Sequence, residues 1–172
     1  MVSWETIVVS METIVERRTG HGQPQTSGIE SHLGYWLRRV SNHVSGAFAR
    51  ALETKHASVA EWVVICRIGA QPGITPGEIA ETLELTRGAV SKIIDKLEAK
   101  KWITRSTKPE DSRAQLLSLT RSGTRILPQL ARIADENDRE FFAVLGPAES
   151  AALRRLLGKL AAFHKIRSVP TD

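Results

Sequence analysis

Most of the chemistry that this sequence can offer to a partner lies in one basic stretch, from Thr86 to Arg125. These 40 residues hold ten Lys or Arg against four acids, a net charge of +6, whereas the other 132 residues hold 14 against 15, a net charge of −1. The whole surplus of the +5 chain therefore falls in under a quarter of its length. A surplus focused in this way is typical of a protein that binds the phosphate backbone of a nucleic acid.

The first part of this stretch has the pattern of a helix with one buried and one polar face. Its apolar side chains recur at helical spacing and predict the buried face: Val90, Ile93, Ile94 and Leu97. The opposite face would be free to meet a DNA groove: Thr86, Arg87, Gly88, Ala89, Ser91, Lys92 and Asp95.

The side chains of the polar face match the groups that duplex DNA presents. Arg87 and Lys92 can bond guanine edges or phosphates, and Ser91 can bond either a phosphate or a base. Ala89 fits against a thymine methyl group, and Gly88 is costly inside a helix, so we expect it to allow a close approach of the backbone. We expect Arg87 to read a base; the alternative is that it belongs to a solvated cationic face.

Two start signals place this helix in a helix-turn-helix. Thr75-Pro76-Gly77-Glu78 combines a capping Thr, a Pro at the first helical position and a Glu that closes the capping box. The short helix that follows has its buried side at residues 79, 80 and 83, Glu84-Leu85 turns the chain, and Thr86 can cap the next helix. Two helices joined by so tight a turn, the second basic at its start, form a helix-turn-helix.

A two-stranded ribbon is predicted after the basic helix. Short apolar segments at residues 102–103 and 116–119 flank a loop of charged and turn-forming residues. We expect the two segments to pair as the strands of a small ribbon.

Helical patterns flank the helix-turn-helix on both sides. Ser27-Gly28-Ile29-Glu30 has the capping-box pattern and predicts a long helix over 29–53, and Ser58-Val59-Ala60-Glu61 predicts a second one that ends at Gly69. After the ribbon, a long helix is predicted over 120–145 and a final one over 147–163. Continuous apolar stripes on the terminal helices favour a dimer interface; the alternative is intrachain packing on the first helix.

The first 28 residues differ from the rest of the chain. Apolar residues between positions 4 and 15 follow helical spacing, so we expect a short amphipathic helix and then a polar linker. Glu5 and Glu12 interrupt the apolar region, so we expect no secretory signal, and no run approaches the roughly 20 apolar residues of a membrane span. With 41% hydrophobic and 25% charged residues, the 172-residue chain is expected to be a cytoplasmic protein with one well-buried core.

The order of these elements and two segments resemble the MarR (multiple antibiotic resistance regulator) family of winged helix-turn-helix transcription factors. The segments are GEIAETLELTRGAVSKIIDKLEAKKWITR and PEDSRAQLLSLTRSG, and the resemblance covers about Ile29 to His164. It implies a mainly α fold with a small β-wing. Residues 57–119 would form the winged helix-turn-helix DNA-binding domain, 29–56 and 120–167 a helical dimerisation region from both termini, and 1–28 an N-terminal extension.

The family resemblance implies a function as well as a fold. A homodimer would bind a pseudo-palindromic operator in double-stranded DNA, most often as a repressor that a small ligand, such as an aromatic or phenolic acid, or oxidation releases. Arg113 resembles the wing-tip arginine that enters the minor groove, with Asp111 to brace it and Lys108 to add a backbone contact. The alternative for Asp111 and Arg113 is an exposed salt bridge of small consequence.

One residue departs from the family pattern. Trp102 stands just before the first wing strand, where the family usually has a small residue, commonly Gly. We expect the bulky ring to pack against the base of the ribbon, and the departure puts the geometry of the turn in question more than the function.

A ligand site would use polar and aromatic residues of the first two helices, because the family binds small aromatic acids near the junction of its dimerisation and DNA-binding parts. The candidates are His32, Tyr35, Trp36, His43, Trp62 and Arg67. Trp36 and Trp62 are in phase with apolar stripes, so a place in the core is the alternative for both. No two histidines stand four residues apart, and we expect neither a metal site nor a cofactor.

Other classes of function have weaker support. The sequence has no phosphate-binding Gly-rich loop, no HExxH and no G-x-S-x-G, so we do not expect an enzyme. The single Cys66 lies in an apolar run and is expected to be a buried, inert thiol; a redox-sensing regulator that acts through Cys66 is the alternative. A winged-helix protein-interaction module without DNA binding is a further alternative, against which the local charge argues.

Overall fold

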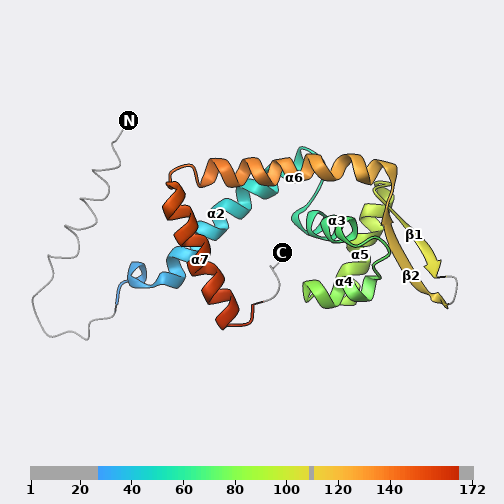
Figure 1. Ribbon diagram of the computed structural model, residues 1–172, viewed down its shortest axis with the longest axis horizontal. Helices are drawn as coiled ribbons and strands as arrows, with labels where there is room; N and C mark the ends of the chain where they lie inside the picture. The colour runs from blue at the N-terminus through green and yellow to red at the C-terminus, as the bar shows by residue number, and fades with distance from the viewer. Residues whose placement is uncertain (1–26, 109–110, 167–172) are drawn as a thin grey trace, which may run out of the picture. The chain divides into compact units, whose positions relative to one another are not determined.

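The computed structural model describes the backbone of residues 27–108 and 111–166, and the side chains of these except residues 108 and 111–114 (Figure 1). The predicted N-terminal helix therefore lies outside the described residues. In chain order the elements are η1 (Ile29–Ser31), α2 (Leu33–Glu53), α3 (Val59–Ala70), α4 (Pro76–Leu83), α5 (Arg87–Ala99), β1 (Ile103–Lys108), β2 (Asp111–Leu119), α6 (Arg121–Phe141) and α7 (Pro147–Phe163). The prediction of a mainly α fold with a small β-wing is confirmed.

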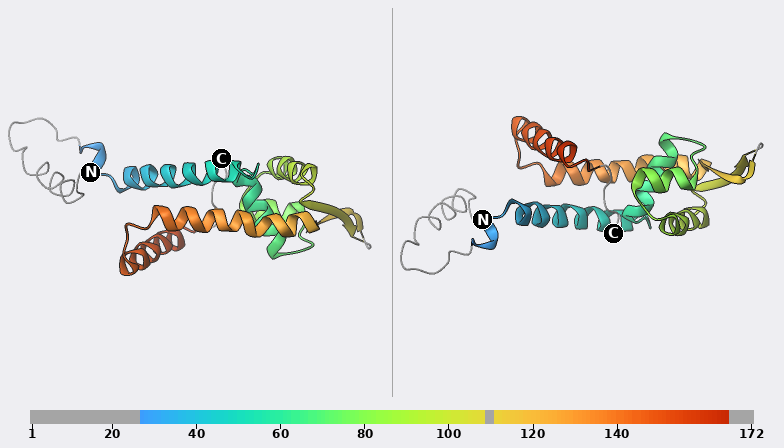
Figure 2. Two further views of the ribbon diagram at one scale, coloured as in Figure 1. Left: turned by 90° about the horizontal axis from the view of Figure 1, so that it is seen from above. Right: turned by 90° about the horizontal axis from the view of Figure 1, so that it is seen from below.

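The described residues belong to two compact units, one that ends at Leu37 and one that begins at Arg38. Within the second unit, the part of α2 that follows Arg38 lies beside α6 (Figure 2). There the side-chain amide of Asn137 donates to the carbonyl of Val44 over 3.5 Å, and the rings of His43 and Phe141 lie 5.8 Å apart.

Local capping starts the helices of the second unit where the sequence predicts. In α3, the N–H of Glu61 donates to Ser58 Oγ and the N–H of Ser58 donates to the Glu61 carboxylate, over 3.2 and 2.7 Å. Thr75 and Glu78 form the same reciprocal pair at the start of α4. These bonds satisfy amide donors that the first turn of a helix leaves free.

The capping box predicted at Ser27 is wrong. Its hydroxyl lies 3.2 Å from His32 Nε2, and α2 begins six residues later, at Leu33. The intervening residues form a single 3₁₀ turn in which the Ser31 hydroxyl donates to the carbonyl of Gly28 over 2.6 Å. A Ser side chain that bonds to nearby backbone in this way competes with continuous helix, which explains the delayed start.

The long helix predicted over 120–145 ends earlier, at Phe141. The chain then turns, and the N–H of Leu145 donates to the carbonyl of Phe142 over 3.0 Å. Gly146 precedes Pro147 and is extended, with ψ 164°, because a residue before proline is disfavoured in helical conformation. The turn must therefore finish before Gly146, whose N–H donates to the Glu149 carboxylate over 2.7 Å and caps α7 as predicted.

The core lies between α3, α4, α5, the wing and α6. It includes the predicted buried face of α5, of which Val90, Ile94 and Leu97 are no more than 1% exposed, whereas Ile93 is half-buried against them. The other large members are Leu52, Val64, Ile65, Ile68, Ile74, Ile79, Ile103, Leu117 and Leu130.

The wing is a two-stranded antiparallel ribbon that a third segment attaches to the helices. Ile103 pairs with Leu119 at its base, and the register becomes irregular after Thr107. The segment between α3 and α4 joins β2, because the N–H of Gly73 donates to the carbonyl of Leu117 and the N–H of Leu117 donates to the carbonyl of Ile74. The ribbon base is therefore held to the helix-turn-helix by backbone bonds.

The turn before the wing contains one position that favours glycine. Lys101 occupies it, one residue before Trp102. Lys101 has φ +58°, and the N–H groups of Lys101 and Trp102 donate back to the carbonyls of Glu98 and Leu97. This is a Schellman motif, whose left-handed residue is usually glycine. Trp102 itself is half-buried against the core, as expected for a ring at the ribbon base.

The close approach of α6 to this turn requires glycine at position 123. A Cβ atom at Gly123 would lie 1.9 Å from the carbonyl oxygen of Trp102, which is backbone and cannot move aside easily. Next to it, the Thr120 hydroxyl both caps α6 and donates to the carbonyl of Lys101 over 2.6 Å. The first turn of α6 therefore packs directly on the turn that precedes β1.

We expect Lys101→Gly to raise the free energy of unfolding by about 1 kcal/mol, because it removes the cost of a side chain at positive φ. Equilibrium denaturation in urea measures the difference. Lys101→Ala keeps a Cβ atom and is the matched control, expected to change stability by less than about 0.5 kcal/mol. An equal gain in both variants would contradict a conformational cause.

Candidate nucleic-acid interface

The predicted DNA-reading face of α5 is at the surface. Arg87, Gly88, Ser91 and Lys92 are exposed on the side opposite the buried apolar residues. Thr86 caps the helix, since its hydroxyl accepts from the N–H of Ala89 over 3.1 Å. Ala89 is half-buried, so its methyl group is less available to a partner than predicted.

Gly88 has open space around it. No atom lies within 4 Å of the place where a Cβ would stand, so neither packing nor backbone strain inside the chain requires glycine there. This is consistent with the expectation that Gly88 lets a partner approach the backbone, although the partner contact stays a prediction.

Asp95 is exposed on the polar face of α5, but its carboxylate has a partner within the chain. Its carboxylate forms an ion pair and hydrogen bond with the guanidinium of Arg105 on β1, and Arg105 Nε also lies 3.0 Å from the Glu98 carboxylate. The periodicity of α5 placed Asp95 on the polar face correctly, but Arg105 comes from another element ten residues along the chain. Arg105 thus connects the recognition helix to the wing.

The wing carries three of the predicted contact residues. Lys108 ends β1, Asp111 begins β2, and these two residues are partners in the ribbon. Arg113 follows in β2, two residues after Asp111. The side chains of all three lie outside the described ones, and their contacts with DNA stay predictions.

The predicted ligand-site residues are divided between the two units, with His32, Tyr35 and Trp36 in the first and His43, Trp62 and Arg67 in the second. In the first unit, His32 contacts Ser27, while the rings of Tyr35 and Trp36 lie 5.5 Å apart and Trp36 Nε1 donates to the carbonyl of Glu30. In the second, His43 neighbours Phe141, Trp62 neighbours Phe48, and Arg67 reaches Thr82 over 3.5 Å. A ligand role for any of these five rings or the arginine stays a prediction.

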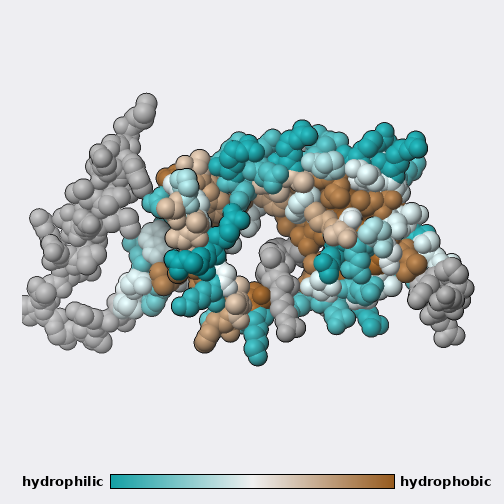
Figure 3. All heavy atoms as spheres, in the orientation of Figure 1, coloured by the Kyte–Doolittle hydropathy of each residue, from teal (hydrophilic) through white to brown (hydrophobic). Residues whose placement is uncertain are grey.

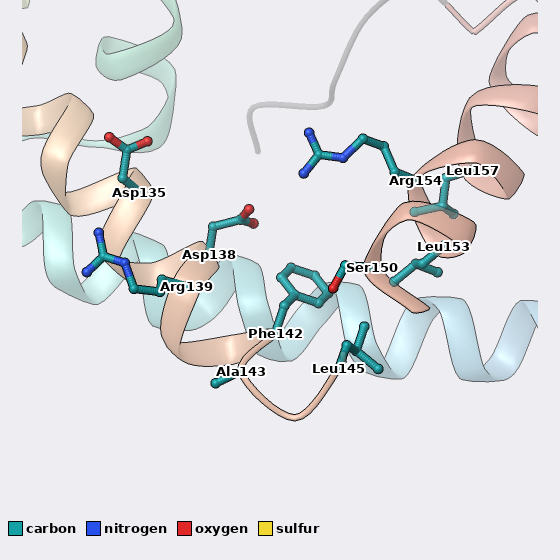
Figure 4. Close-up of a pocket in the computed structure, with 10 residues that line it drawn as sticks. All are labelled: Asp135, Asp138, Arg139, Phe142, Ala143, Leu145, Ser150, Leu153, Arg154 and Leu157. Carbon is teal, nitrogen blue, oxygen red and sulfur yellow. The ribbon is translucent and has the colours of Figure 1, made fainter. Parts of the chain in front are cut away.

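A groove that sequence reasoning missed lies between the end of α6 and α7 (Figure 4). It has a volume of about 680 Å³, with Phe142, Leu145 and Leu153 among its apolar residues and Asp138 and Arg154 among its charged ones. The turn that ends α6 at Phe141 connects the two walls of the groove. Because the sequence predicted a helix as far as residue 145, it did not predict this turn or the groove.

Helix α7 exposes apolar side chains. Its large apolar residues are 42% to 79% exposed: Leu156, Leu157, Leu160 and Phe163. Figure 3 shows apolar surface in the part of the molecule that holds this helix. Stripes of this kind mark surfaces that a partner covers. In the first unit and the start of the second, Leu33, Leu37 and Val40 of α2 are likewise 44% to 80% exposed.

Two other kinds of site have no candidate among the described residues. No group of three or more His, Cys, Asp or Glu is placed to hold a metal ion in that part of the chain. None of the described helices is both long and apolar enough to cross a membrane.

Comparisons with known proteins agree on one family. The model of the MarR family matches residues 57–114, which span the helix-turn-helix and most of the wing. The multiple antibiotic resistance protein MarR of Salmonella typhimurium is 33% identical over 129 residues, 74% of this chain and 90% of that protein. The protein of the same name from Escherichia coli is 29% identical over the same shares of the two chains.

Solved structures agree with this assignment. A variant of MarR from Escherichia coli in complex with operator DNA is 29% identical, with a TM-score of 0.67 over 74% of this chain and 92% of that one. The transcriptional repressor CouR, bound to a 23-mer DNA duplex, is 26% identical, with a TM-score of 0.72 over 81% of this chain and 99% of that one. With its helix-turn-helix, its wing and these relatives, the chain belongs to the MarR family of transcriptional regulators.

Proposed function

We propose that this chain is a homodimeric, sequence-specific DNA-binding repressor that a small ligand releases from its operator. The observation that carries the proposal is the exposed basic face of α5, held outward by the burial of Val90, Ile94 and Leu97 on the opposite face of the same helix. The two relatives of known structure bound to DNA support a duplex as the partner.

The exposed face of α5 would enter the major groove. Arg87 stands in the first turn, where a recognition helix approaches base edges, and its guanidinium can bond two guanine acceptors at once. Lys92 and Ser91 would contact phosphates or bases from the same face, while Thr86, Gly88 and Ala89 would line the approach.

The wing would contact the adjacent minor groove. Arg113 would enter the groove, Asp111 would brace its guanidinium, and Lys108 would contact the backbone. Arg105 supports this arrangement, because its ion pairs with Asp95 and Glu98 of α5 join the wing to the recognition helix.

A second copy of the chain would cover the exposed apolar residues of α2 and α7. Leu33, Leu160 and Phe163 expose 47% to 80% of their surface in the single chain, which is unfavourable in water. A symmetric dimer would bury them and would present two winged modules to the two halves of a pseudo-palindromic operator. In this proposal residues 57–119 bind DNA, and residues 29–56 and 120–167 form the dimer.

The effector would be a small aromatic or phenolic acid that changes the spacing of the two modules. What supports this is the family to which the chain belongs.

The function is tested by the salt dependence of binding to a duplex that the purified chain itself selects from a random-sequence pool. We expect one sequence to be enriched and its affinity to fall steeply with salt, with a log-log slope of about −0.9 per neutralised phosphate. Electrophoretic mobility shifts at several salt concentrations give the slope. Absence of any enriched sequence, or affinity independent of salt, would refute the proposal.

Replacing the wing arginine tests the second contact surface. We expect Arg113→Ala to weaken binding to the selected duplex by about tenfold or more, since a desolvated guanidinium contact is lost. Arg132→Ala removes the same charge from an exposed position on α6 and is the matched control. Sedimentation should show an unchanged dimer in both variants; an equal effect of the two on affinity would leave no special role for the wing.

The redox alternative has an observation against it. Cys66 is half-buried in α3, and burial raises the pKa of its thiol to about 12. At pH 8 only about one thiol in ten thousand would be the reactive thiolate. A sensor cysteine needs the opposite, an exposed thiol with a lowered pKa.

We expect iodoacetamide at pH 8 to alkylate Cys66 at least about a hundredfold more slowly in the folded chain than in the same chain in guanidinium chloride. Mass spectrometry of quenched samples measures both rates. Equal rates would show an accessible, reactive thiol and would restore oxidation as a candidate signal.

A further inference from the structure

The C-terminal end of the recognition helix is tied to the turn between α2 and α3 by a nearly buried ion pair. Lys100 caps the end of α5, and its ammonium lies 2.5 Å from the carboxylate of Glu61 in the first turn of α3. Glu61 is 3% exposed, although most residues of this type lie at the surface. A carboxylate in such a place calls for a specific partner.

Lys100 reaches a second group on the same turn. Its ammonium also donates to the carbonyl of His56 over 2.5 Å. His56 lies in the turn after α2, three residues beyond Glu53, and has φ +54°. The ammonium further lies 5.0 Å from the ring centroid of Trp102, at the base of the wing. One side chain therefore contacts the α2–α3 turn, the first turn of α3 and the base of the wing.

The contacts of Glu61 favour its ionised form despite its burial. Burial by itself would raise the pKa of the Glu61 carboxyl, but the hydrogen bond and charge of Lys100 and the bond from the Ser58 N–H hold it below its ordinary value. The carboxylate is therefore ionised at neutral pH. Removal of Lys100 would leave a buried charge without its counter-charge, which costs far more than the loss of an exposed salt bridge.

The contacts of Lys100 constrain the orientation of α5, which apolar packing alone does not. The rest of the contact between α3 and α5 is made by apolar side chains such as Val64, Ile68 and Ile94, which attract without regard to direction. The bonds to Glu61 and His56 have fixed acceptors, so they define the angle and rotation of α5. A small rotation of the helix would move Arg87 and Lys92 away from the positions they need in a groove.

We propose that Lys100 is a positioning residue, which through Glu61 and His56 fixes the recognition helix against the α2–α3 turn in the orientation that specific DNA binding requires. The inference rests on the proposed function and deepens it. It also gives a path by which a displacement of α2 would reach the DNA-reading face, since the carbonyl of His56 belongs to the turn that directly follows that helix.

The competing explanation is that Lys100 contributes to DNA binding only by its positive charge. Lys96 provides the matched comparison. It stands one turn earlier on α5, borders the same surface hollow as Lys100 and Glu61, and is exposed. No ion pair of Lys96 occurs among the described side chains. Lys96→Met and Lys100→Met thus remove the same charge from the same helix, but only the second removes the restraint.

The experiment measures affinity for two duplexes, the one selected by the wild-type chain and a scrambled duplex of the same composition. We expect Lys100→Met to lower affinity for the selected duplex at least about threefold more than Lys96→Met does, with equal effects of the two on the scrambled duplex. Thermal melts of both variants establish a temperature at which they are folded. Equal losses on the selected duplex would overturn the proposal.

Glu61→Gln gives a second, independent measurement, because the two explanations predict different changes in affinity for the selected duplex. The change removes a negative charge, so a purely electrostatic role predicts unchanged or tighter binding to both duplexes. Gln also completes a capping box, so α3 keeps its start. Positioning predicts at least about a twofold weaker affinity for the selected duplex alone. Tighter or unchanged binding would overturn the proposal even where Lys100→Met fails to fold.

Failure of the inference and failure of the proposed function are separate outcomes. Enrichment of a sequence by the wild-type chain tests the function before any variant is made. If a sequence is enriched and Lys100→Met behaves as Lys96→Met does, DNA-binding function stands and the positioning role falls.

Discussion

Burial of the apolar face of α5 is the constraint on which the rest of the structure depends. Val90, Ile94 and Leu97 pack against α3, α4 and the base of the wing, and each is at most 1% exposed. Because side chains on a helix have a fixed angular spacing, burying these three holds Arg87 and Lys92 at the surface. The hydrophobic effect fixes which face is inside, but it does not by itself fix the angle of the helix.

Polar contacts supply that angle at several points. Arg105 joins the middle of α5 to β1, and Lys100 joins its end to the α2–α3 turn. Backbone bonds of Gly73 and Ile74 to Leu117 hold the wing to the helices. Each of these contacts joins elements that the apolar core alone would leave free to rotate or slide. The DNA-binding module is therefore braced at the base of the wing and at both sides of the recognition helix.

The apolar residues exposed on α7 and at the start of α2 are a different kind of feature. They are not needed to complete the core around α5, which is already closed by Leu130 of α6 and Leu52 of α2. An exposed apolar stripe of several large residues needs an additional explanation, and a second copy of the chain provides one within the proposed function. The same arrangement would allow the distance between two DNA-binding modules to depend on helices that do not touch DNA.

The sequence by itself determined the features that rest on neighbouring residues. Thr75 and Thr86 cap their helices where predicted, and the periodicity of α5 separates its buried from its exposed face. These signals are local, since a cap or a helical face involves residues three or four apart. The same logic misplaced the start of α2, because the nearby Ser31 hydroxyl diverted the first turn.

Only the tertiary structure decided the contacts between distant residues. Asp95 looked available on the polar face until Arg105 was found beside it, and Glu61 looked like a cap alone, although it also binds Lys100, 39 residues away. Gly123 has its place because the carbonyl of Trp102 lies against it, which no spacing along the chain indicates. These roles depend on how helices and strands meet in space, and burial of the α5 face is what brings them together.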